Sequence, residues 1–320
     1  MIIDIPTSEE YEDVAIECLV QAYNNIVQVD NSLTNETPRE EIWKYHQIVL
    51  RTSIVLIHQG LEGLMKADIC SESPLLLIDK KKSEWKTLPG ASDESFSEMF
   101  TIGGDDLLKM YFACVEPKYV HADFLAHFND VRSKRNKIVH GLGEADLKPE
   151  YVLKLVLNTF TFLLGKDEFW DAVLNKFYRH PGIEHEDPEI EWEENNHYNR
   201  MEHLNFFLGI GELKKHFTTD ITVRAYFCPN CIQNAEVITK EGIKRPESKW
   251  AFLTPNEPAS TTISCIVCQE QFEVLREDCK KPGCKGNVIY KEDEDEDCHV
   301  RICLTCWNEE DIDTSNEALD

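Results

Sequence analysis

Apolar residues recur at helical spacing over most of the first 180 residues. The clearest stripe lies within residues 37–67, where apolar side chains are spaced four, three, four and three residues apart. It consists of Leu50, Ile54, Ile57, Leu61 and Leu64. This spacing places all five on one face of a helix, the face by which one helix packs on another. The pattern predicts a long helix that belongs to a bundle.

Similar patterns predict further helices on either side of this one. They cover residues 8–29, 105–114, 121–140 and 149–178. The apolar face of the last is formed by Val152, Leu155, Val156, Phe160 and Leu163. Residues 71–104 carry Pro, Ser, Gly and three consecutive Lys, which is typical of a loop with short elements. The fold expected for residues 1–180 is a bundle of four or five helices, and the protein as a whole is expected to be mainly α.

Local signals mark two of the helix starts. Ser8 is followed by two Glu and is the expected N-cap of the first helix. Residues 37–40 read TPRE, a capping box with Pro at the first helical position. Inside the long helix, Glu62 and Lys66 are four residues apart, so we expect them to pair on its surface.

The C-terminal part of the chain is rich in cysteine, since nine of the twelve Cys follow residue 227. Eight of the nine form a regular series of close pairs. They are Cys228, Cys231, Cys265, Cys268, Cys279, Cys284, Cys303 and Cys306. A gap of two residues lets both thiolates of a pair bind one metal ion, and two pairs complete the tetrahedral shell that Zn²⁺ prefers. Residues 221–306 are therefore predicted to form two β-rich zinc ribbons that hold two structural Zn²⁺.

Alternative interpretations of these cysteines fit less well. A disulfide framework is typical of secreted chains, and the N-terminus does not read as a signal peptide. A redox CxxC needs a strand-helix unit that the flanking residues do not indicate. Four thiolates leave no open coordination position, so we expect no catalytic metal, and a zinc hydrolase is a distant alternative. Cys298 and His299 lie beside the second group, and either could replace an assigned ligand there.

Three earlier cysteines, Cys18, Cys70 and Cys114, stand singly among residues with a helical pattern. A cysteine in that setting usually packs as a small hydrophobic residue. We therefore expect them to be buried and chemically inert.

The net charge of −26 is concentrated in two segments, because residues 184–194 and 291–320 contribute −7 and −10 of it. These read as solvated segments: an acidic linker that runs into one more helix at 200–216, together covering 181–220, and an acidic tail at 307–320. The richest apolar run, in 151–165, is interrupted by Lys154 and Asn158 and falls short of a membrane span. We expect a cytoplasmic protein with no membrane partner, whose acidity repels RNA or DNA except at a local basic site.

One such basic site lies in residues 132–141, RSKRNKIVHG. On an ideal helix, Arg135 falls within the same sector of about 80° as the apolar residues Phe124, Phe128, Val131 and Val139. A cation inside an apolar stripe suggests a function. Asn136 and His140 are four residues apart at the edge of that face, and Gly141 suits the left-handed residue that closes a helix.

These side chains match the chemistry of RNA cleavage. RNA supplies its own nucleophile, the 2′-OH, so cleavage needs a proton acceptor, a proton donor and a cation over the developing charge, without a metal. Histidine transfers protons near neutral pH, and a guanidinium can grip two phosphate oxygens. Arg135 and His140 point about 140° apart on one helix, so two copies could surround a strand more easily than one. We therefore expect a homodimer with the site at its interface.

At this point residues 8–178 resemble the HEPN domain family. Arg135-Asn136-Lys137-Ile138-Val139-His140 looks like its signature, an Arg and a polar residue followed by a His near the end of a bundle helix. The stretches GLEGLMKADI at 60–69 and TIGGDDLLK at 101–109 are similar to neighbouring parts of that family. The resemblance implies a dimeric, metal-independent endoribonuclease of the kind found among toxins and antiviral defence effectors. In it Arg135 and His140 would be catalytic and Asn136 would assist.

Two other interpretations remain open. Residues 132–140 could be a solvated basic helix end in which Arg135 pairs with an acid such as Glu62. The protein could also be a non-catalytic dimeric scaffold that presents its zinc ribbons to a protein or nucleic acid. The ribbons are not part of the HEPN pattern, and under either function they would serve to recognise a partner protein or an RNA.

Overall fold

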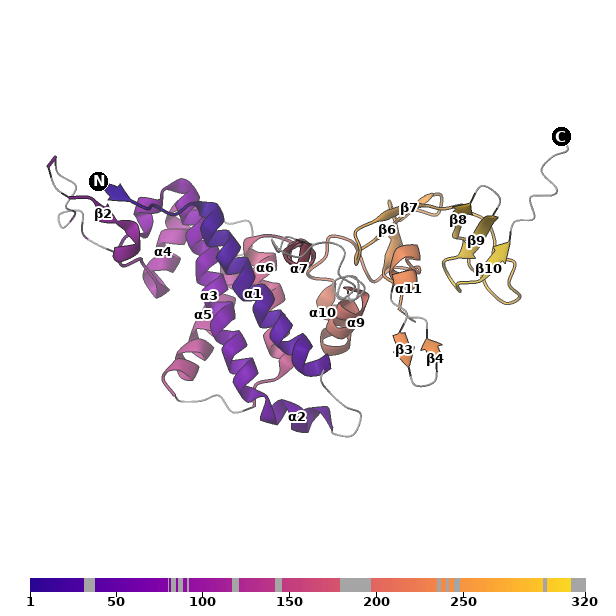
Figure 1. Ribbon diagram of the computed structural model, residues 1–320, viewed down its shortest axis with the longest axis horizontal. Helices are drawn as coiled ribbons and strands as arrows, with labels where there is room; N and C mark the ends of the chain where they lie inside the picture. Colours follow the sequence, from indigo (N-terminus) through magenta and orange to yellow (C-terminus); the bar gives the residue numbers. More distant parts are fainter. Residues whose placement is uncertain are drawn as a thin grey trace. The chain divides into compact units, whose positions relative to one another are not determined.

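The computed structural model of the chain describes residues 1–31, 38–79, 81, 85, 89–90, 92–116, 121–141, 146–178, 197–234, 237–239, 242–244, 248–295 and 298–311. The chain divides into two compact units, Met1–Arg179 and His180–Asp320. The first unit is mainly α-helical, and small sheets make up much of the second (Figure 1). A mainly α protein with a small C-terminal β region is thus confirmed.

Helices account for most of the first unit. They are α1 (Ser8–Asn31), α2 (Arg39–Tyr45), α3 (Gln47–Glu72), α4 (Gly104–Cys114), α5 (His121–Val139), α6 (Pro149–Leu163) and α7 (Glu168–Tyr178). Helix α3 is central, because α1, α4, α5 and α6 all pack against it. The apolar stripe predicted for it is buried from Leu50 to Leu64. By length and composition α3 could also cross a membrane, a test that the core helix of a soluble protein passes equally well.

Helices α1 and α3 run side by side at very short range (Figure 1). Glycines on α3 allow this approach. A Cβ atom built on Gly60 would lie 2.6 Å from Cγ of Leu19, and one on Gly63 would lie 2.8 Å from Cβ of Ala15. Real Cβ atoms essentially never come that close, so a larger residue at either position would force the two helices apart.

Both long helices expected from the sequence are interrupted. The helix expected over 37–67 is two helices, because His46 ends α2 before α3 begins at Gln47. The helix expected over 149–178 ends at Leu163, and Gly165 (φ 144°) and Asp167 (φ 70°) turn the chain before α7. Positive φ is incompatible with a continuing right-handed helix.

The N-terminal cap of α1 is one residue earlier than expected. Thr7 Oγ1 accepts a hydrogen bond from the Glu10 N–H (3.1 Å), and the Glu10 carboxylate accepts one from the Thr7 N–H (2.8 Å). This reciprocal pair is a capping box. Ser8, the expected cap, instead donates its hydroxyl to the carbonyl oxygen of Ala67 on α3 (2.8 Å). Thr37 of the capping box expected at 37–40 lies outside the described residues. Pro38, expected at the first helical position, instead occupies the N-cap position of α2, which begins at Arg39.

Short elements link α3 to α4, as the sequence predicted for residues 71–104. They are η1 (Pro74–Leu77), β2 (Glu94–Ser95) and η3 (Phe96–Glu98). Strand β1 (Ile2–Ile3) pairs in parallel with β2. A bridge between Ile78 and Thr101 closes the connection. The first pairing holds residues 94–95 against the beginning of the chain, and the second holds Thr101 against Ile78.

The second unit combines short helices with small sheets. Its helices are α9 (His197–Leu208), α10 (Ile210–Leu213) and α11 (Pro229–Asn234). Its strands are β3 (Val237–Thr239), β4 (Gly242–Lys244), β5 (Ala251–Leu253), β6 (Thr262–Cys265), β7 (Gln271–Glu273), β8 (Ile289–Asp295), β9 (Cys298–Cys303) and β10 (Glu309–Asp311). Strands β5-β6-β7 form one antiparallel sheet, β8-β9-β10 a second, and β3-β4 a hairpin.

The segments expected to flank the ribbons are only partly described. The helix expected at 200–216 is α9 and α10, which are separated by Gly209 at φ 70°. The predicted acidic linker at 184–194 and most of the predicted tail, from residue 312, lie outside the described residues.

Hydrogen bonds join α9 and both sheets of this unit. The Glu202 carboxylate of α9 accepts from the indole N–H of buried Trp250 (2.7 Å) and from the Ser248 hydroxyl (2.6 Å). Backbone pairing between Leu275 and Ile289 connects the β5-β6-β7 region with the β8-β9-β10 sheet. These contacts link α9 with the β5-β6-β7 region and, through it, with the β8-β9-β10 sheet.

Candidate functional site

Two groups of four cysteines lie in the second unit. One is Cys228, Cys231, Cys265 and Cys268, and the other is Cys279, Cys284, Cys303 and Cys306. Within each group the four sulfur atoms all lie within 4.8 Å of one another. Each group could therefore hold a metal ion, in the pairing that the cysteine spacing predicted.

The separations between sulfur atoms distinguish a metal site from disulfides. Cys228 Sγ and Cys268 Sγ are 3.6 Å apart, and Cys231 Sγ and Cys265 Sγ are 3.7 Å apart. In the second group the closest pairs are separated by 3.8 and 4.0 Å. A disulfide needs about 2.05 Å between sulfurs. A tetrahedron with metal–sulfur bonds of about 2.3 Å has edges of about 3.8 Å, so both groups have the size of a four-thiolate metal site.

The backbone around each group is shaped to hold sulfur ligands. The N–H of Val267 points at Cys265 Sγ (3.3 Å) and that of Gly286 at Cys284 Sγ (3.2 Å), and such contacts orient ligands and stabilise thiolates. Gln269 (φ 61°) and Trp307 (φ 55°), which directly follow the second CxxC pair of each group, adopt left-handed backbone conformations. These conformations turn the chain back beside the sulfurs.

In each group, the four sulfur atoms of the chain would complete the tetrahedral shell of one metal ion. Crowding them together lowers the pKa of Cys268, chiefly through its hydrogen bond from Cys228, while burial raises the pKa of Cys265. A divalent cation would resolve this crowding by binding all four as thiolates. The side chains of Cys298 and His299 lie outside the described part of the structure.

The C-terminal end of α5 carries the residues predicted to be catalytic. Arg135 and Asn136 are partly buried, and Arg135 donates a hydrogen bond to Asn136 Oδ1 (3.0 Å). His140 is exposed in the turn after α5, and its N–H bonds to the Asn136 carbonyl (3.0 Å). Gly141 has a φ of 73°, which confirms the left-handed residue expected at the helix end.

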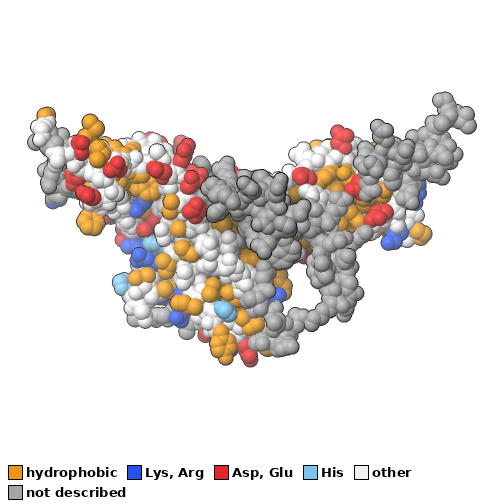
Figure 2. All heavy atoms as spheres, in the orientation of Figure 1, with side chains coloured by type: hydrophobic (Ala, Val, Ile, Leu, Met, Phe, Trp, Pro, Cys, Tyr) orange, Lys and Arg blue, Asp and Glu red, His pale blue; other side chains and the backbone are white. Residues whose placement is uncertain are grey.

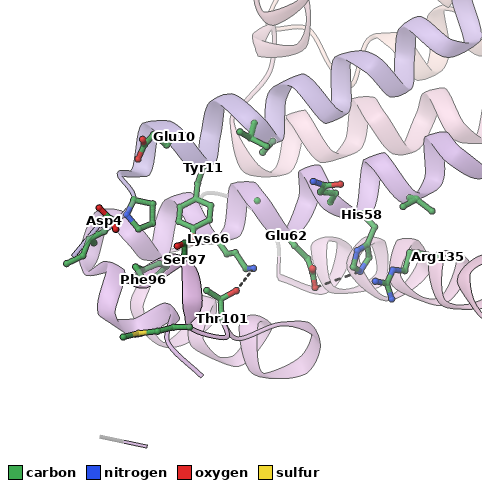
Figure 3. A pocket seen from close by; sticks show the side chains of 18 residues that line it. Asp4, Glu10, Tyr11, His58, Glu62, Lys66, Phe96, Ser97, Thr101 and Arg135 are labelled. Carbon is green, nitrogen blue, oxygen red and sulfur yellow. Dashed lines mark hydrogen bonds and ion pairs between the residues drawn. The ribbon is translucent and has the colours of Figure 1, made fainter. Parts of the chain in front are cut away.

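The apolar stripe of α5 ends before Arg135. Phe124, Phe128 and Val131 are buried, but Val139 is 53% exposed, so the expectation that the stripe continues to Val139 is wrong. Arg135 forms no ion pair with any carboxylate in the described part of the chain, and the suggested pairing with Glu62 is not formed. Its guanidinium instead faces an open cleft (Figure 3).

This cleft has a volume of about 990 Å³ and lies within the first unit. One wall is the middle of α3, with His58, Glu62 and Lys66 on one face (Figure 3). The beginning of the chain and residues 96–101 form the other walls, and Arg135 lies at the end next to His58. His140 does not line it. Within one chain, the structure therefore places Arg135 in the cleft and His140 outside it.

The charged groups in the cleft hold one another in place. Glu62 Oε1 accepts the Gly104 N–H (3.1 Å) and lies 3.8 Å from His58 Nε2. Lys66 Nζ donates to Thr101 Oγ1 (2.9 Å), so its expected pairing with Glu62 is wrong. Burial lowers the pKa of His58, and the nearby Arg135 lowers it further against the opposing effect of Glu62. His58 is therefore a neutral imidazole between a carboxylate and a guanidinium.

No role was predicted for His58 from the sequence. A signal was present, since His58, Glu62 and Lys66 are spaced four residues apart and so share one helix face. Their meeting with Arg135 depends on the packing of α5 against α3, which spacing along one helix does not encode.

Cys18, Cys70 and Cys114 were predicted to be buried, and the structure largely agrees. Cys18 and Cys70 are buried, and Cys114 is partly buried. Burial raises the pKa of each thiol, which keeps it protonated and unreactive.

On the face of the molecule in Figure 2, Asp and Glu side chains cover much of the upper edge of the first unit, whereas Lys and Arg side chains appear at a few separate places. A ligand with negative charge would meet favourable groups only locally on such a surface.

Comparison with protein-family models, with curated protein sequences and with solved structures found no match to this chain.

Proposed function

We propose that the protein is a metal-independent endoribonuclease in which Arg135, Asn136 and His140 act on the scissile phosphodiester. The observation that carries this proposal is the state of Arg135. It is a partly buried cation that no carboxylate neutralises within the described residues, and an exposed histidine follows it five residues later. A cation held without a counter-ion is costly unless it meets an anionic ligand.

The chemistry assigned to these residues is cleavage of RNA by its own 2′-OH. A histidine accepts the proton of the 2′-OH, whose oxygen then attacks the adjacent phosphorus. The bond to the 5′-oxygen breaks, and the protonated histidine gives the proton to that oxygen, so the products are a 2′,3′-cyclic phosphate and a 5′-OH. The guanidinium of Arg135 offsets the charge that develops on the phosphate oxygens. Asn136, hydrogen-bonded to Arg135, fixes the orientation of the guanidinium.

A homodimer would bring the two catalytic groups onto one strand. Arg135 faces the cleft of its own chain and His140 lies on the surface outside it. A second copy related by a twofold axis could place its His140 opposite Arg135 of the first. The exposed Leu125 and Val139, which flank the site on α5, are apolar groups that such an interface would cover.

We assign the metal of both four-cysteine groups as structural Zn²⁺. The support is the match between the sulfur separations and the edge of a tetrahedral zinc–thiolate site. Zinc would stabilise a module too thin for a large apolar core, and that module would recognise the RNA or a partner protein.

The proposal is tested by incubating the purified full-length protein with tRNA and total RNA in the presence of EDTA, with zinc content measured afterwards. Cleavage that leaves 2′,3′-cyclic phosphate ends is expected. It should fall at least a hundredfold in Arg135→Ala and in His140→Ala. Lys109→Ala, which removes an exposed cation from α4, is the matched control and should cleave like wild type. Cleavage by both variants at the wild-type rate would refute the assignment.

A second candidate function is that of a scaffold that binds a partner through the ribbons. The observation in its favour is the continuous hydrogen-bonded module formed by α9 and the two sheets. In that case Arg135→Ala and His140→Ala would leave partner binding intact, zinc removal would abolish it, and overexpression would not be toxic.

A further inference from the structure

The cleft of the first unit has the dimensions of a ligand site. Its volume of about 990 Å³ is at the upper end of the range typical for small-molecule pockets. His58, Glu62 and Lys66 line its floor in that order along α3 (Figure 3). Eight residues separate the first from the last, which is about 12 Å along the helix axis. The cleft can therefore accept an elongated ligand that meets these three groups in succession.

One end of the cleft suits a phosphate group. The Arg135 guanidinium lies there without an ion pair in the described part of the chain. The neutral imidazole of His58 beside it can donate a hydrogen bond. A planar guanidinium binds two oxygens of a phosphate at once, and partial burial strengthens the attraction.

The middle of the cleft suits a ribose. The Glu62 carboxylate is oriented by the Gly104 N–H, and its remaining lone pairs can accept hydrogen bonds from sugar hydroxyls. The Lys66 ammonium, fixed by Thr101, has donors left for sugar oxygens. Its pKa is lowered by burial, as expected of a cation that is partly withdrawn from water.

The far end combines an aromatic wall with acids that are already engaged. Tyr11 faces the cleft, and burial raises the pKa of its phenol, so the ring keeps its O–H donor (Figure 3). Asp4 accepts a hydrogen bond from Ser95, and Glu10 belongs to the capping box of α1. An aromatic ring beside polar groups is a surface on which a nucleobase can stack.

We propose that this cleft binds a ribonucleoside monophosphate unit, with the phosphate at Arg135 and His58, the ribose at Glu62 and Lys66, and the base against Tyr11. In the proposed ribonuclease, on which this role rests, each chain would hold one nucleotide of the RNA strand next to the cleaved bond. His58 is then a phosphate-binding residue, separate from the histidine expected to move protons.

The test is isothermal titration of the full-length protein with 5′-AMP, 3′-AMP, deoxyadenosine monophosphate, adenosine and inorganic phosphate at low salt. Ribonucleoside monophosphates should bind most tightly. Adenosine, which lacks the phosphate, should bind at least tenfold more weakly than AMP. Inorganic phosphate, which lacks the nucleoside, should also bind at least tenfold more weakly. Equal binding of AMP and adenosine, or no binding of either monophosphate at millimolar concentration, would overturn the proposal.

Substitutions of the cleft residues test where AMP binds. Arg135→Gln should weaken AMP binding at least tenfold, Tyr11→Leu several-fold, and Glu62→Gln should reduce the preference for the ribonucleotide. Lys109→Ala is the matched control, because Lys109 is an exposed cation of α4 that does not line the cleft. Thermal unfolding checks that each variant folds, and Lys66→Gln, at a partly exposed position, provides a second probe of the cleft. AMP binding that none of the cleft variants changes would overturn the assignment.

The titration and the cleavage assay separate this inference from the proposed function. RNA cleavage without mononucleotide binding would leave the ribonuclease standing and reject the nucleotide site. Mononucleotide binding without RNA cleavage would reject the ribonuclease and keep the cleft as a nucleotide site.

Discussion

The contact between α1 and α3 gives a sharp test of the bundle that supports the cleft. Replacing Gly60 by Ala adds one methyl group on the face of α3 that meets α1. That methyl carbon would lie 2.6 Å from Cγ of Leu19 and 2.9 Å from the carbonyl oxygen of Ala15. Because the carbonyl belongs to the backbone of α1, the clash can be relieved only by moving the helix.

Two opposing effects set the size of the change. Removing a glycine from a helix interior stabilises the helix by about 1 kcal/mol. Forcing an extra methyl into a packed core costs about 1–3 kcal/mol, and contacts this short place Gly60 at the upper end of that range. The steric effect should win, and the free energy of unfolding should fall by about 1–2 kcal/mol. For a unit of this size, that corresponds to a decrease of roughly 2–8 °C in Tm.

Calorimetric unfolding of the full-length protein measures the effect. Gly211→Ala in α10 is the matched control, because a Cβ there meets no atom within 4 Å. The control should leave the protein unchanged or slightly more stable. If Gly60→Ala raises Tm in the same way, α1 and α3 do not pack as closely as described, and the shape of the cleft between them would be in doubt.

Three further predictions follow from other contacts. Burial lowers the pKa of His127 from its usual 6.5 to about 4. Between these pH values the unfolded chain binds a proton that the folded chain does not. The free energy of unfolding should therefore fall by about 3 kcal/mol as the pH is lowered from 6.5 to 4. His127→Gln, which can still donate a hydrogen bond to Thr159, should remove that loss in urea titrations, and an unchanged pH dependence would contradict the assignment. Elemental analysis should find two zinc ions per chain and one in Cys268→Ser, whereas an equal content in both would rule out the four-cysteine site. Glu202→Ala leaves the indole N–H of buried Trp250 without its partner and should cost about 1–3 kcal/mol, while a neutral effect in chemical unfolding would mean that water replaces the carboxylate.

Helical periodicity predicted the core of the bundle because burial of one face is a local property of the sequence. The stripe from Leu50 to Leu64 on α3 is buried as expected. The interruptions at His46 and at 164–167 were missed because apolar residues continue on both sides of them. The second carried a local signal in Gly165 and Asp167, both of which take positive φ. The first has none of comparable strength, since His46 is compatible with a helix interior.

The metal ligands could be paired from sequence because coordination chemistry restricts their spacing. A CxxC pair reaches one ion only through a tight turn. Three such pairs and the more widely spaced Cys279 and Cys284 imply two sites almost irrespective of the rest of the fold. The cleft is different, since its groups come from the N-terminal segment, α3, residues 96–101 and α5. His58, Glu62 and Lys66 all belong to α3, and their common face was visible in the sequence. The sequence did not indicate which other elements would pack against that face.

The position of Arg135 on α5 could be predicted from the sequence, but the groups around it depend on the fold. Its position on the apolar side of α5 was predicted, and the structure explains it, because α5 leaves the core after Val131 and Arg135 is the next residue of the stripe. The partner considered from the sequence, the carboxylate of Glu62, does not pair with it. The guanidinium is instead oriented by Asn136 toward the cleft. Arg135→Lys therefore separates charge from geometry: an ammonium would keep the attraction for phosphate but lose both the bidentate contact and the Asn136 orientation, so nucleotide affinity should fall less than cleavage does.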